Sequence, residues 1–471
     1  MELSFIKEQW RNRLPELLIL LLMFVLVCIN LSLFLQVDVW RQDSMYYVSA
    51  YNDKLAEEGR WINYLFFNFL RILPSDLAIL ISYASIVGFT YSVAVRVTNS
   101  HYFSLAFGIL CVLVPVLPVQ LQWPETLLFG FIFLALSPRL QQVLPPYYFF
   151  PLMGILFFGT FSAFYFLMPL LFLRDLDFPR FWRLMAYWMG SFIVAYLVTQ
   201  LLVFAFTGNT MQIAGWRQPH YVVDFASLLD NVARVASSFV AHWGKAQVFL
   251  KPAVVGVLGL IAIAVAIVKK QYFTLIVGVV SALGIYVSVI PIGIYIQERT
   301  TLSVFIALFA ALFVYGYQSR KALLAVMIVM ALLSIRLAST SHEEIGWYKT
   351  LNTVLQQQFS EAIEHHPEEV NRVFIAVEVP EVLTVFRAID ARIKHKTLLS
   401  EDFSPPLYWV PTLKQMGYTQ FRICQDLQGW DCDQVVEYYK RRNELKRDHG
   451  LFISQRLPGG DLLIMLNPQN P

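Results

Sequence analysis

Charged residues are scarce in this sequence. Asp, Glu, Lys and Arg make up 15% of its 471 residues, against about 25% in an ordinary soluble domain. Hydrophobic residues make up 57%, and the mean hydropathy is +0.55. These values exclude a soluble globular enzyme, a disordered chain and a nucleic-acid binder. They predict an integral membrane protein with many spans.

The motifs of common soluble enzymes are also missing. The chain has no G-x-x-x-x-G-K-[ST], G-x-G-x-x-G, G-x-S-x-G or H-E-x-x-H, so ATP-driven transport and zinc proteolysis of those types have no support. The eight histidines do not cluster at metal-ligand spacing. We therefore expect no cofactor, and the need for a divalent metal stays open.

Cysteine is rare, with four residues in the chain. Cys28 and Cys111 lie in apolar segments and are expected to be packing residues. Cys424 and Cys432 have neither a C-x-x-C redox spacing nor a zinc spacing. In an oxidising compartment this pair can form a disulfide, whereas in the cytosol both thiols stay free, so the outcome depends on topology.

Long apolar runs are abundant. The first, residues 14–36, is too long for the apolar region of a cleavable signal peptide and predicts a first membrane helix. With it, eleven spans are expected, several of them near or below the usual length. The other ten are residues 76–95, 102–120, 125–138, 146–158, 160–173, 184–207, 252–268, 272–291, 301–317 and 322–337.

The charges divide the chain into two predicted domains. Residues 1–337 hold 22 Lys and Arg against 15 Asp and Glu, and residues 338–471 hold 14 against 18. The first part is expected to be the membrane domain and the second a soluble, acidic one. Basic residues gather in the short loops of one side, which places the N-terminus in the cytoplasm and the longer loops 37–75 and 208–251 outside. An odd number of spans also places 338–471 outside, in the periplasm.

Within 338–471 the pattern predicts a small α/β domain. Residues 342–366 and 381–393 are expected to be helical, and VFIAVEV, FRIC, LFISQ and DLLIML are expected to be strands. Gly459 and Gly460 suit a hairpin turn between the last two strands.

Acids near the expected membrane surface are candidates for catalysis, because a charge near a bilayer is costly. Asp43, in RQDSMYY, can act as a general base, although a lone acid is more often a solvated loop residue. Glu57 and Glu58, in EEGRW, and Glu125, in QWPET, are the other candidate acids. Glu125 can also simply complement a helix dipole.

Arginines and aromatic residues of the outer loops are candidates for substrate binding. Arg60 follows Gly59, which allows a turn, and a guanidinium binds phosphate oxygens with two parallel hydrogen bonds. The equally plausible alternatives are ion pairing and anchoring at the membrane surface. Trp216, Arg217, His220 and Trp243 are candidates for sugar binding, because aromatic rings beside polar groups suit saccharide faces and edges, although most such Trp residues are interfacial anchors. Arg299 can bind a lipid phosphate or pair with a neighbouring acid.

Three segments, QDSMYY, EEGRWINYLFF and QWPETLLFG, carry a family resemblance within residues 36–140. The chain resembles the type II glucosyl transferase family, the serotype-converting O-antigen glucosyltransferases of bacterial inner membranes, which are GT-C-like membrane enzymes. GTFSAFYFLMPLLFL and ERTTLSV match more loosely. The family often has an acidic pair in its first loop, where this chain has Gln42 and Asp43. The family's Gly-Arg segment matches Gly59 and Arg60.

The resemblance implies an inverting hexosyltransferase of the bacterial inner membrane. The donor would be a sugar, such as glucose, on polyprenyl phosphate, and the acceptor a lipid-linked glycan such as O-antigen. Asp43 would be the base, and Arg60 and Arg299 would lie near the phosphate. Three alternatives remain: another lipid-sugar enzyme (an O-antigen polymerase or a protein mannosyltransferase-like enzyme), a transporter or flippase of lipid-linked sugars, or a non-catalytic scaffold.

Overall fold

The computed structural model describes most of the first 362 residues and part of the tail. The described residues are 2–37, 51–70, 72–121, 124–174, 176–362, 367–376, 413, 417–418, 420–423, 452–457 and 459–466. They belong to two compact units. Unit 1 comprises Met1–Leu35 and Tyr51–Glu343, and unit 2 comprises Gln36–Ala50 and Glu344–Pro471.

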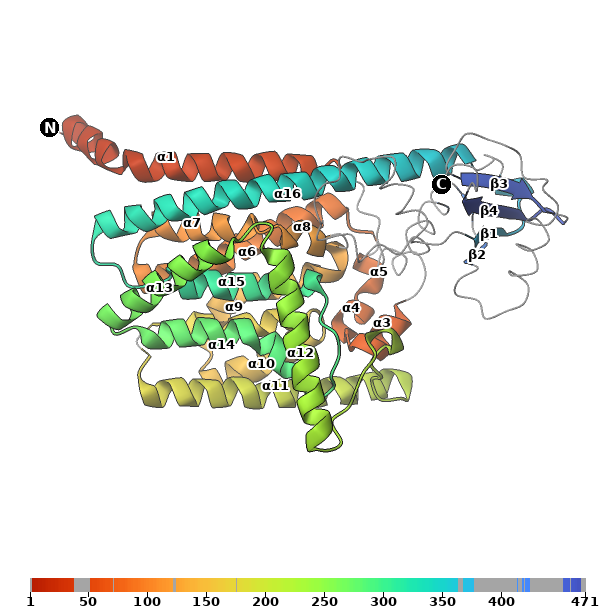
Figure 1. Cartoon of the computed structure of the whole chain (residues 1–471), viewed down its shortest axis with the longest axis horizontal. Helices are drawn as coiled ribbons and strands as arrows, with labels where there is room; N and C mark the ends of the chain where they lie inside the picture. Colours follow the sequence, from red (N-terminus) through yellow and green to blue (C-terminus); the bar gives the residue numbers. More distant parts are fainter. Residues whose placement is uncertain are drawn as a thin grey trace. The chain divides into compact units, whose positions relative to one another are not determined.

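Unit 1 is a bundle of apolar helices with parallel or antiparallel axes (Figure 1). α6 packs against α7 and α9, α10 against α11, and α14 against α15. Aliphatic and aromatic side chains fill the interior and also cover much of the outside. The bundle helices are α1 (Glu2–Phe34), α6 (Ser75–Thr98), α7 (His101–Val112), α9 (Pro124–Val143), α10 (Pro146–Phe158), η1 (Ser162–Phe172), α11 (Phe178–Thr207), α13 (Pro252–Val268), α14 (Tyr272–Ser288), α15 (Leu302–Phe313) and α16 (Arg320–Ala362).

Five of the described helices are long and apolar enough to cross a membrane. They are Arg13–Phe34, Ser75–Thr98, Pro124–Val143, Phe178–Thr207 and Arg320–Gly346. The other six expected spans overlap with shorter apolar helices of 10–17 residues, and two of them, 102–120 and 301–317, extend beyond the helices His101–Val112 and Leu302–Phe313. The structure is therefore that of a helical protein with several candidate membrane spans, and the number eleven stays a prediction.

The break at Gly159 separates two elements, α10 and the 3-10 helix η1, which pack against each other. A Cβ atom on Gly159 would lie 2.7 Å from the Trp61 ring. The Gly159 carbonyl accepts a hydrogen bond from Ile62 N at 3.0 Å. Because Gly159 has no side chain, the short helix that begins at Trp61 can approach the break closely.

α1 and α16 run in the same direction. Near their starts, Arg320 Nε donates to Glu16 Oε1 at 2.7 Å, and further along Asn30 Nδ2 donates to the Ala338 carbonyl at 3.0 Å. Both partners of the second pair follow those of the first in sequence, which is possible only for parallel neighbours. The start of α1 and residue 343 therefore lie at opposite ends of the bundle.

The short helices lie at one end of the bundle, which we call the loop end. Because consecutive bundle helices alternate in direction, the segments that join them on this side meet there (Figure 1). At this end Tyr51 and Leu55 are buried, with exposed fractions of 2% and 1%. The short helices are α3 (Asn52–Glu58), α4 (Trp61–Leu65), α5 (Phe67–Leu70), α8 (Val116–Gln120), η2 (Gly215–Arg217) and η3 (Glu298–Thr300), and the longer α12 (Phe225–Ala246) lies at this end as well.

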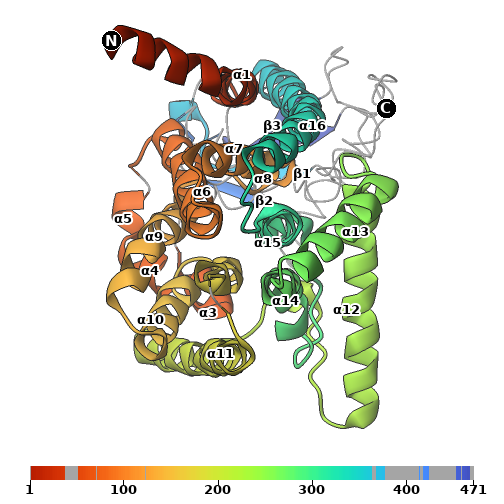
Figure 2. The same ribbon diagram turned by 90° about the vertical axis from the view of Figure 1, so that its left-hand side faces the viewer.

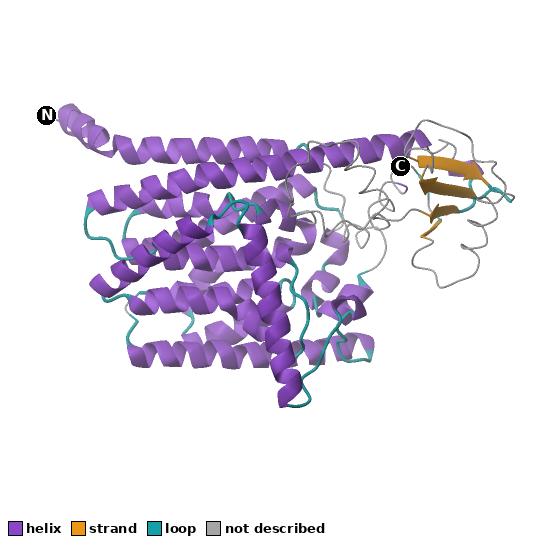
Figure 3. Ribbon diagram, viewed as in Figure 1, coloured by secondary structure: helices purple, strands orange, loops and turns teal. Residues whose placement is uncertain are grey.

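The described part of unit 2 contains a four-stranded sheet in the order β2-β1-β4-β3 (Figure 3). β1 (Val373–Ala376) pairs in parallel with β2 (Phe421–Ile423) and β4 (Leu462–Leu466). β3 (Phe452–Arg456) and β4 form an antiparallel hairpin. Gly459 and Gly460 have φ of 91° and 83° at its turn, so the four strands and the hairpin are confirmed. A further 3-10 turn, η4, spans Pro367–Glu369.

One expectation for the tail needs correction. The helix expected to begin at His342 is the continuation of α16, which runs without interruption from Arg320 to Ala362. This stretch contains no proline, and its single glycine, Gly346, does not end the helix. The helix expected at 381–393 lies outside the described residues.

Candidate functional site

Three cations converge on one buried carboxylate at the loop end. Glu58 Oε1 lies 2.8 Å from Lys54 Nζ and 3.3 Å from Arg217 Nη2, and Glu58 Oε2 lies 2.5 Å from Arg60 Nη2. The exposed fractions of the four side chains are 8% for Lys54 and Glu58, 11% for Arg60 and 26% for Arg217. We call these four residues the Glu58 cluster.

The turn after α3 folds Arg60 back onto Glu58. Gly59 ends α3 with φ of 68°, and its N–H donates to the Leu55 carbonyl at 3.0 Å. This left-handed conformation favours glycine. A Cβ atom on Gly59 would also lie 2.6 Å from Thr199 Cγ2 and 2.8 Å from Met211 Sδ. Both backbone conformation and space therefore require glycine between the two charged residues.

Arg217 reaches the cluster from a distant part of the chain. The segment after α11 is attached to α3, because Gln212 N donates to the Ala56 carbonyl at 3.0 Å. Met211 N donates in turn to the Gln200 side chain at 2.9 Å. These bonds bring η2, and with it Arg217, back to the end of α3.

The Glu58 cluster carries a net positive charge. Burial disfavours the ionised carboxylate, but the charges of Arg60, Lys54 and Arg217 offset this effect and hold the pKa of Glu58 well below its usual value. Of the four side chains, three are cationic and one is anionic. Such a cluster suits an anion such as a phosphate, and an ionised Glu58 with so low a pKa is a poor proton acceptor.

Glu125 lies in a separate set of contacts at the start of α9. It is 8% exposed and accepts a hydrogen bond from Ser75 Oγ. The next residue, Thr126, offers its carbonyl to Asn63 Nδ2 at 2.6 Å, and Asn63 Nδ2 also lies 3.2 Å from Tyr51 Oη. These bonds attach α4 to the start of α9 and fix Arg60, directly before α4, against the bundle.

A second buried carboxylate, Glu298, lies in η3. Its Oε1 accepts from Lys245 Nζ at 2.6 Å and from Tyr295 Oη at 3.1 Å, and lies 4.0 Å from His242 Nε2. Burial raises the pKa of Glu298, but the hydrogen bond and charge of Lys245 and the charge of His242 more than offset this and lower it. The neighbouring Arg299 is 7% exposed.

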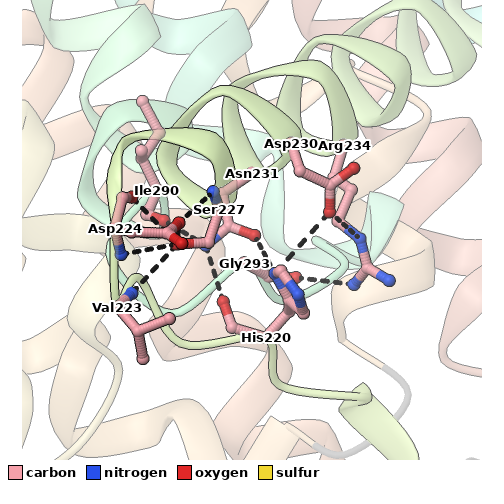
Figure 4. A network of polar contacts seen from close by, with 9 residues as sticks. All are labelled: His220, Val223, Asp224, Ser227, Asp230, Asn231, Arg234, Ile290 and Gly293. Atoms are coloured by element: carbon pink, nitrogen blue, oxygen red, sulfur yellow. Dashed lines mark hydrogen bonds and ion pairs between the residues drawn. The ribbon is translucent and has the colours of Figure 1, made fainter.

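His220 belongs to a polar network at the start of α12 (Figure 4). Its Nδ1 lies 2.9 Å from Asn231 Oδ1. Asn231 Nδ2 donates to the carbonyls of His220, at 2.6 Å, and Ile290, at 2.9 Å. His220 thus joins two loops to α12, and its expected contact with substrate stays a prediction.

The remaining candidates are placed less completely. Asp43, Cys424 and Cys432 lie outside the described residues, and the side chain of Trp216, in η2, is not described. Glu57 lies on α3, and Trp243 lies on α12. Among the expected residues, the structure brings Glu58, Arg60 and Arg217 together.

Sequence reasoning missed Lys54. Its spacing of four residues from Glu58 on one helix was the available signal, since such residues are neighbours on a helix surface. It also missed Asn63 and Ser75, whose contacts with Thr126 and Glu125 join segments 63 and 50 residues apart. No local pattern marks those contacts.

Neither a search for metal-binding groups nor comparison with known proteins assigns a function to any residue of the site. Within the described ranges, no three His, Cys, Asp or Glu side chains are grouped so as to hold a metal ion. Comparison of the chain with protein-family models, curated proteins and solved structures gives no match.

Proposed function

We propose that this protein is an integral-membrane glycosyltransferase that moves a hexose from a polyprenyl-phosphate sugar to a lipid-linked glycan such as O-antigen. The observation that carries the proposal is the Glu58 cluster, in which three cations meet one buried carboxylate at the end of an apolar bundle. A phosphate leaving group needs cationic stabilisation, and a lipid donor needs an apolar environment beside it.

The roles of the acids differ in this proposal. Glu58 holds Lys54, Arg60 and Arg217 together, and the cations stabilise the phosphate that departs from the sugar. Because Glu58 has a lowered pKa, the base that removes the proton from the acceptor hydroxyl is a different residue. The resemblance to the type II glucosyl transferases assigns that role to Asp43.

The proposal also includes a location. The loop end faces the periplasm of a bacterial inner membrane, with the N-terminus in the cytoplasm. The tail beyond the candidate span Arg320–Gly346, which the sequence placed at residues 338–471, forms a soluble periplasmic α/β domain in which Cys424 and Cys432 pair as a disulfide. Basic residues at the other end of the bundle, including Arg96, Arg139 and Lys269, support this orientation.

The test is mass spectrometry of the surface polysaccharide from a deletion strain complemented with variants at equal protein level. We expect the wild type to add one hexose per repeat unit, and Asp43→Asn and Arg60→Gln to add none. Arg180→Gln is the matched control, because Arg180 is 60% exposed and pairs with Asp177 at the opposite end of the bundle. It should behave as the wild type.

Each result bears on a separate part of the proposal. Normal transfer by Asp43→Asn would move the search for the base to Glu57 or Glu125. Normal transfer by Arg60→Gln would remove the Glu58 cluster from the reaction. If wild-type and deletion strains have the same polysaccharide, the transferase proposal is wrong.

A further inference from the structure

The segment expected to be an outer loop, 208–251, contains a helix of 22 residues, α12. Its start is fixed by a capping box, in which Asp224 Oδ1 accepts from Ser227 N at 2.7 Å and Ser227 Oγ accepts from Asp224 N at 2.9 Å. Figures 1 and 2 show α12 crossing the direction of the bundle helices. A helix in this orientation stays at one level of the bundle over its length.

Hydrogen bonds place α12 at the loop end and fix its rotation about its own axis. Asn231 Nδ2 donates to the Ile290 carbonyl at 2.9 Å. His242 Nε2 lies 2.8 Å from the Ile296 carbonyl, which can only accept, so this nitrogen carries a proton and donates. Both carbonyls belong to the segment that joins α14 to α15. Since hydrogen bonds are directional, α12 presents a fixed face to this segment.

The buried face of α12 is a narrow stripe with a different flank on each side. The stripe repeats at helical spacing through Asn231, Val235, Ser238, His242 and Ala246. At 3.6 residues per turn, Asp230, Arg234 and Ser237 fall on one side of the stripe. The opposite flank holds five exposed large apolar residues: Phe225 (72%), Leu229 (54%), Val232 (43%), Phe239 (40%) and Val240 (66%).

We propose that α12 lies in the surface plane of the membrane, with this apolar flank buried among the acyl chains of the membrane's own lipids. A helix held sideways against a membrane bundle meets three environments: protein, hydrocarbon and water. The buried stripe faces protein, the apolar flank faces hydrocarbon, and the polar flank faces water. Exposed Phe, Leu and Val at one level, opposite charged residues, are typical of interfacial helices.

This location links the lipid surface to the Glu298 segment. α12 holds the Ile296 carbonyl through His242 and the Glu298 carboxylate through Lys245, at 2.6 Å. The depth of α12 in the membrane is therefore coupled to the depth of η3 and of Arg299. The inference does not depend on the proposed transferase activity.

The test compares one residue on each flank. Nitroxide labels are placed at Leu229→Cys and, as the matched control, Ser237→Cys in the full chain, with the four native cysteines replaced by alanine. The protein is reconstituted in vesicles of phosphatidylethanolamine and phosphatidylglycerol. We expect label 229 to collide several-fold more often with oxygen, which concentrates in lipid, than with a water-soluble nickel chelate, and label 237 to show the reverse.

Two results would overturn the proposal. Equal access of the nickel chelate to both labels would place the apolar flank in water. Exclusion of both reagents from label 229 would mean that protein, such as a second copy of the chain, covers it. If the cysteine-free chain does not fold, p-benzoylphenylalanine at 229 and 237 in the otherwise native chain gives the same decision. Crosslinking to lipid from 229 alone supports the proposal, and crosslinking from 229 to protein contradicts it.

Discussion

Glu58 is the residue on which the candidate site depends most. It is the common partner of three cations, of which Lys54 is as buried as Glu58 and Arg60 nearly so. Removing one partner of a buried ion pair costs more than the pair contributes, because the remaining charges lose their compensation. Here the loss would remove the carboxylate that three neighbouring cations share.

We therefore expect Glu58→Gln to lower the free energy of unfolding by about 3 kcal/mol at neutral pH. The measurement is thermal or denaturant unfolding in detergent, with Asn52→Ala as the control on the same helix, which should have a much smaller effect because Asn52 is exposed. An equal loss in both variants would mean that α3 tolerates no substitution and would remove the special role of Glu58.

The pH dependence has a definite sign. Because the folded-state pKa of Glu58 lies well below its usual value, its contribution to stability is fully present above the unfolded-state pKa of about 4.3. It is lost as the pH falls through the folded-state pKa. The difference in stability between wild type and Glu58→Gln should thus stay constant from pH 8 to about pH 5 and shrink only in stronger acid. A difference that disappears near neutral pH would contradict the assignment.

Local spacing accounts for part of the site, but not for all of it. Lys54 and Arg60 lie within a few residues of Glu58, so a helix followed by a glycine turn suffices to bring them together. Arg217 is 159 residues away from Glu58 in sequence. The position of Arg217 beside Glu58 depends on the hydrogen bonds that the backbone N–H groups of Gln212 and Met211 donate. No sequence pattern specifies these bonds.

At the level of elements, the chain offers two glycines that test the geometry of the turn after α3. Gly59 and Gly208 both end a helix with positive φ, 68° and 74°. A Cβ atom on Gly208 would meet nothing within 4 Å, whereas one on Gly59 would approach Thr199 and Met211. The two positions therefore share the backbone strain and differ in the available space.

Gly208→Ala should cost about 1–2 kcal/mol of stability, the price of a left-handed residue with a side chain. Gly59→Ala should cost about 1–3 kcal/mol more because of overpacking, and it should abolish hexose transfer, since the clash displaces Arg60. Unfolding in detergent measures the first effect and polysaccharide mass spectrometry the second. Equal costs would show that Thr199 and Met211 can move aside.

Hydropathy predicted the apolar helices well because burial in lipid requires long apolar runs, and it predicted the strands of unit 2 from their bounded apolar segments. It missed α12, whose apolar residues are interleaved with Asp230, Arg234 and Lys245 at helical spacing. A period of 3.6 residues marks such a helix. Its orientation across the bundle follows from the hydrogen bonds of Asn231 and His242, which the sequence does not reveal.

At the level of the whole molecule, the parallel α1 and α16 simplify the question of topology. Counting spans from hydropathy makes the location of the tail depend on an uncertain number, because one error reverses the result. The hydrogen bonds between Glu16 and Arg320 and between Asn30 and Ala338 give the relative direction of the two helices without any count of spans. The start of α1 and residue 343 lie at opposite ends of the bundle, so a cytoplasmic N-terminus requires that the chain leave the bundle on the outer side.

We expect thiol labelling of spheroplasts to show this orientation. Thr210 follows α11 at the loop end, and Gln318 precedes α16 at the basic end; both are exposed. In a chain without its four native cysteines, an impermeant maleimide should label Thr210→Cys in spheroplasts and Gln318→Cys only after the membrane is opened. Because basic residues are enriched in cytoplasmic loops, Arg320 and Lys321, which lie beside Gln318, lead us to expect this end inside. Labelling of Gln318→Cys alone in intact spheroplasts would invert the molecule and, with it, place the Glu58 cluster in the cytoplasm, away from an outward-facing glycan acceptor. Labelling of both positions without opening the membrane would instead contradict an odd number of crossings between them, that is, the assignment of α13, α14 and α15 as three spans.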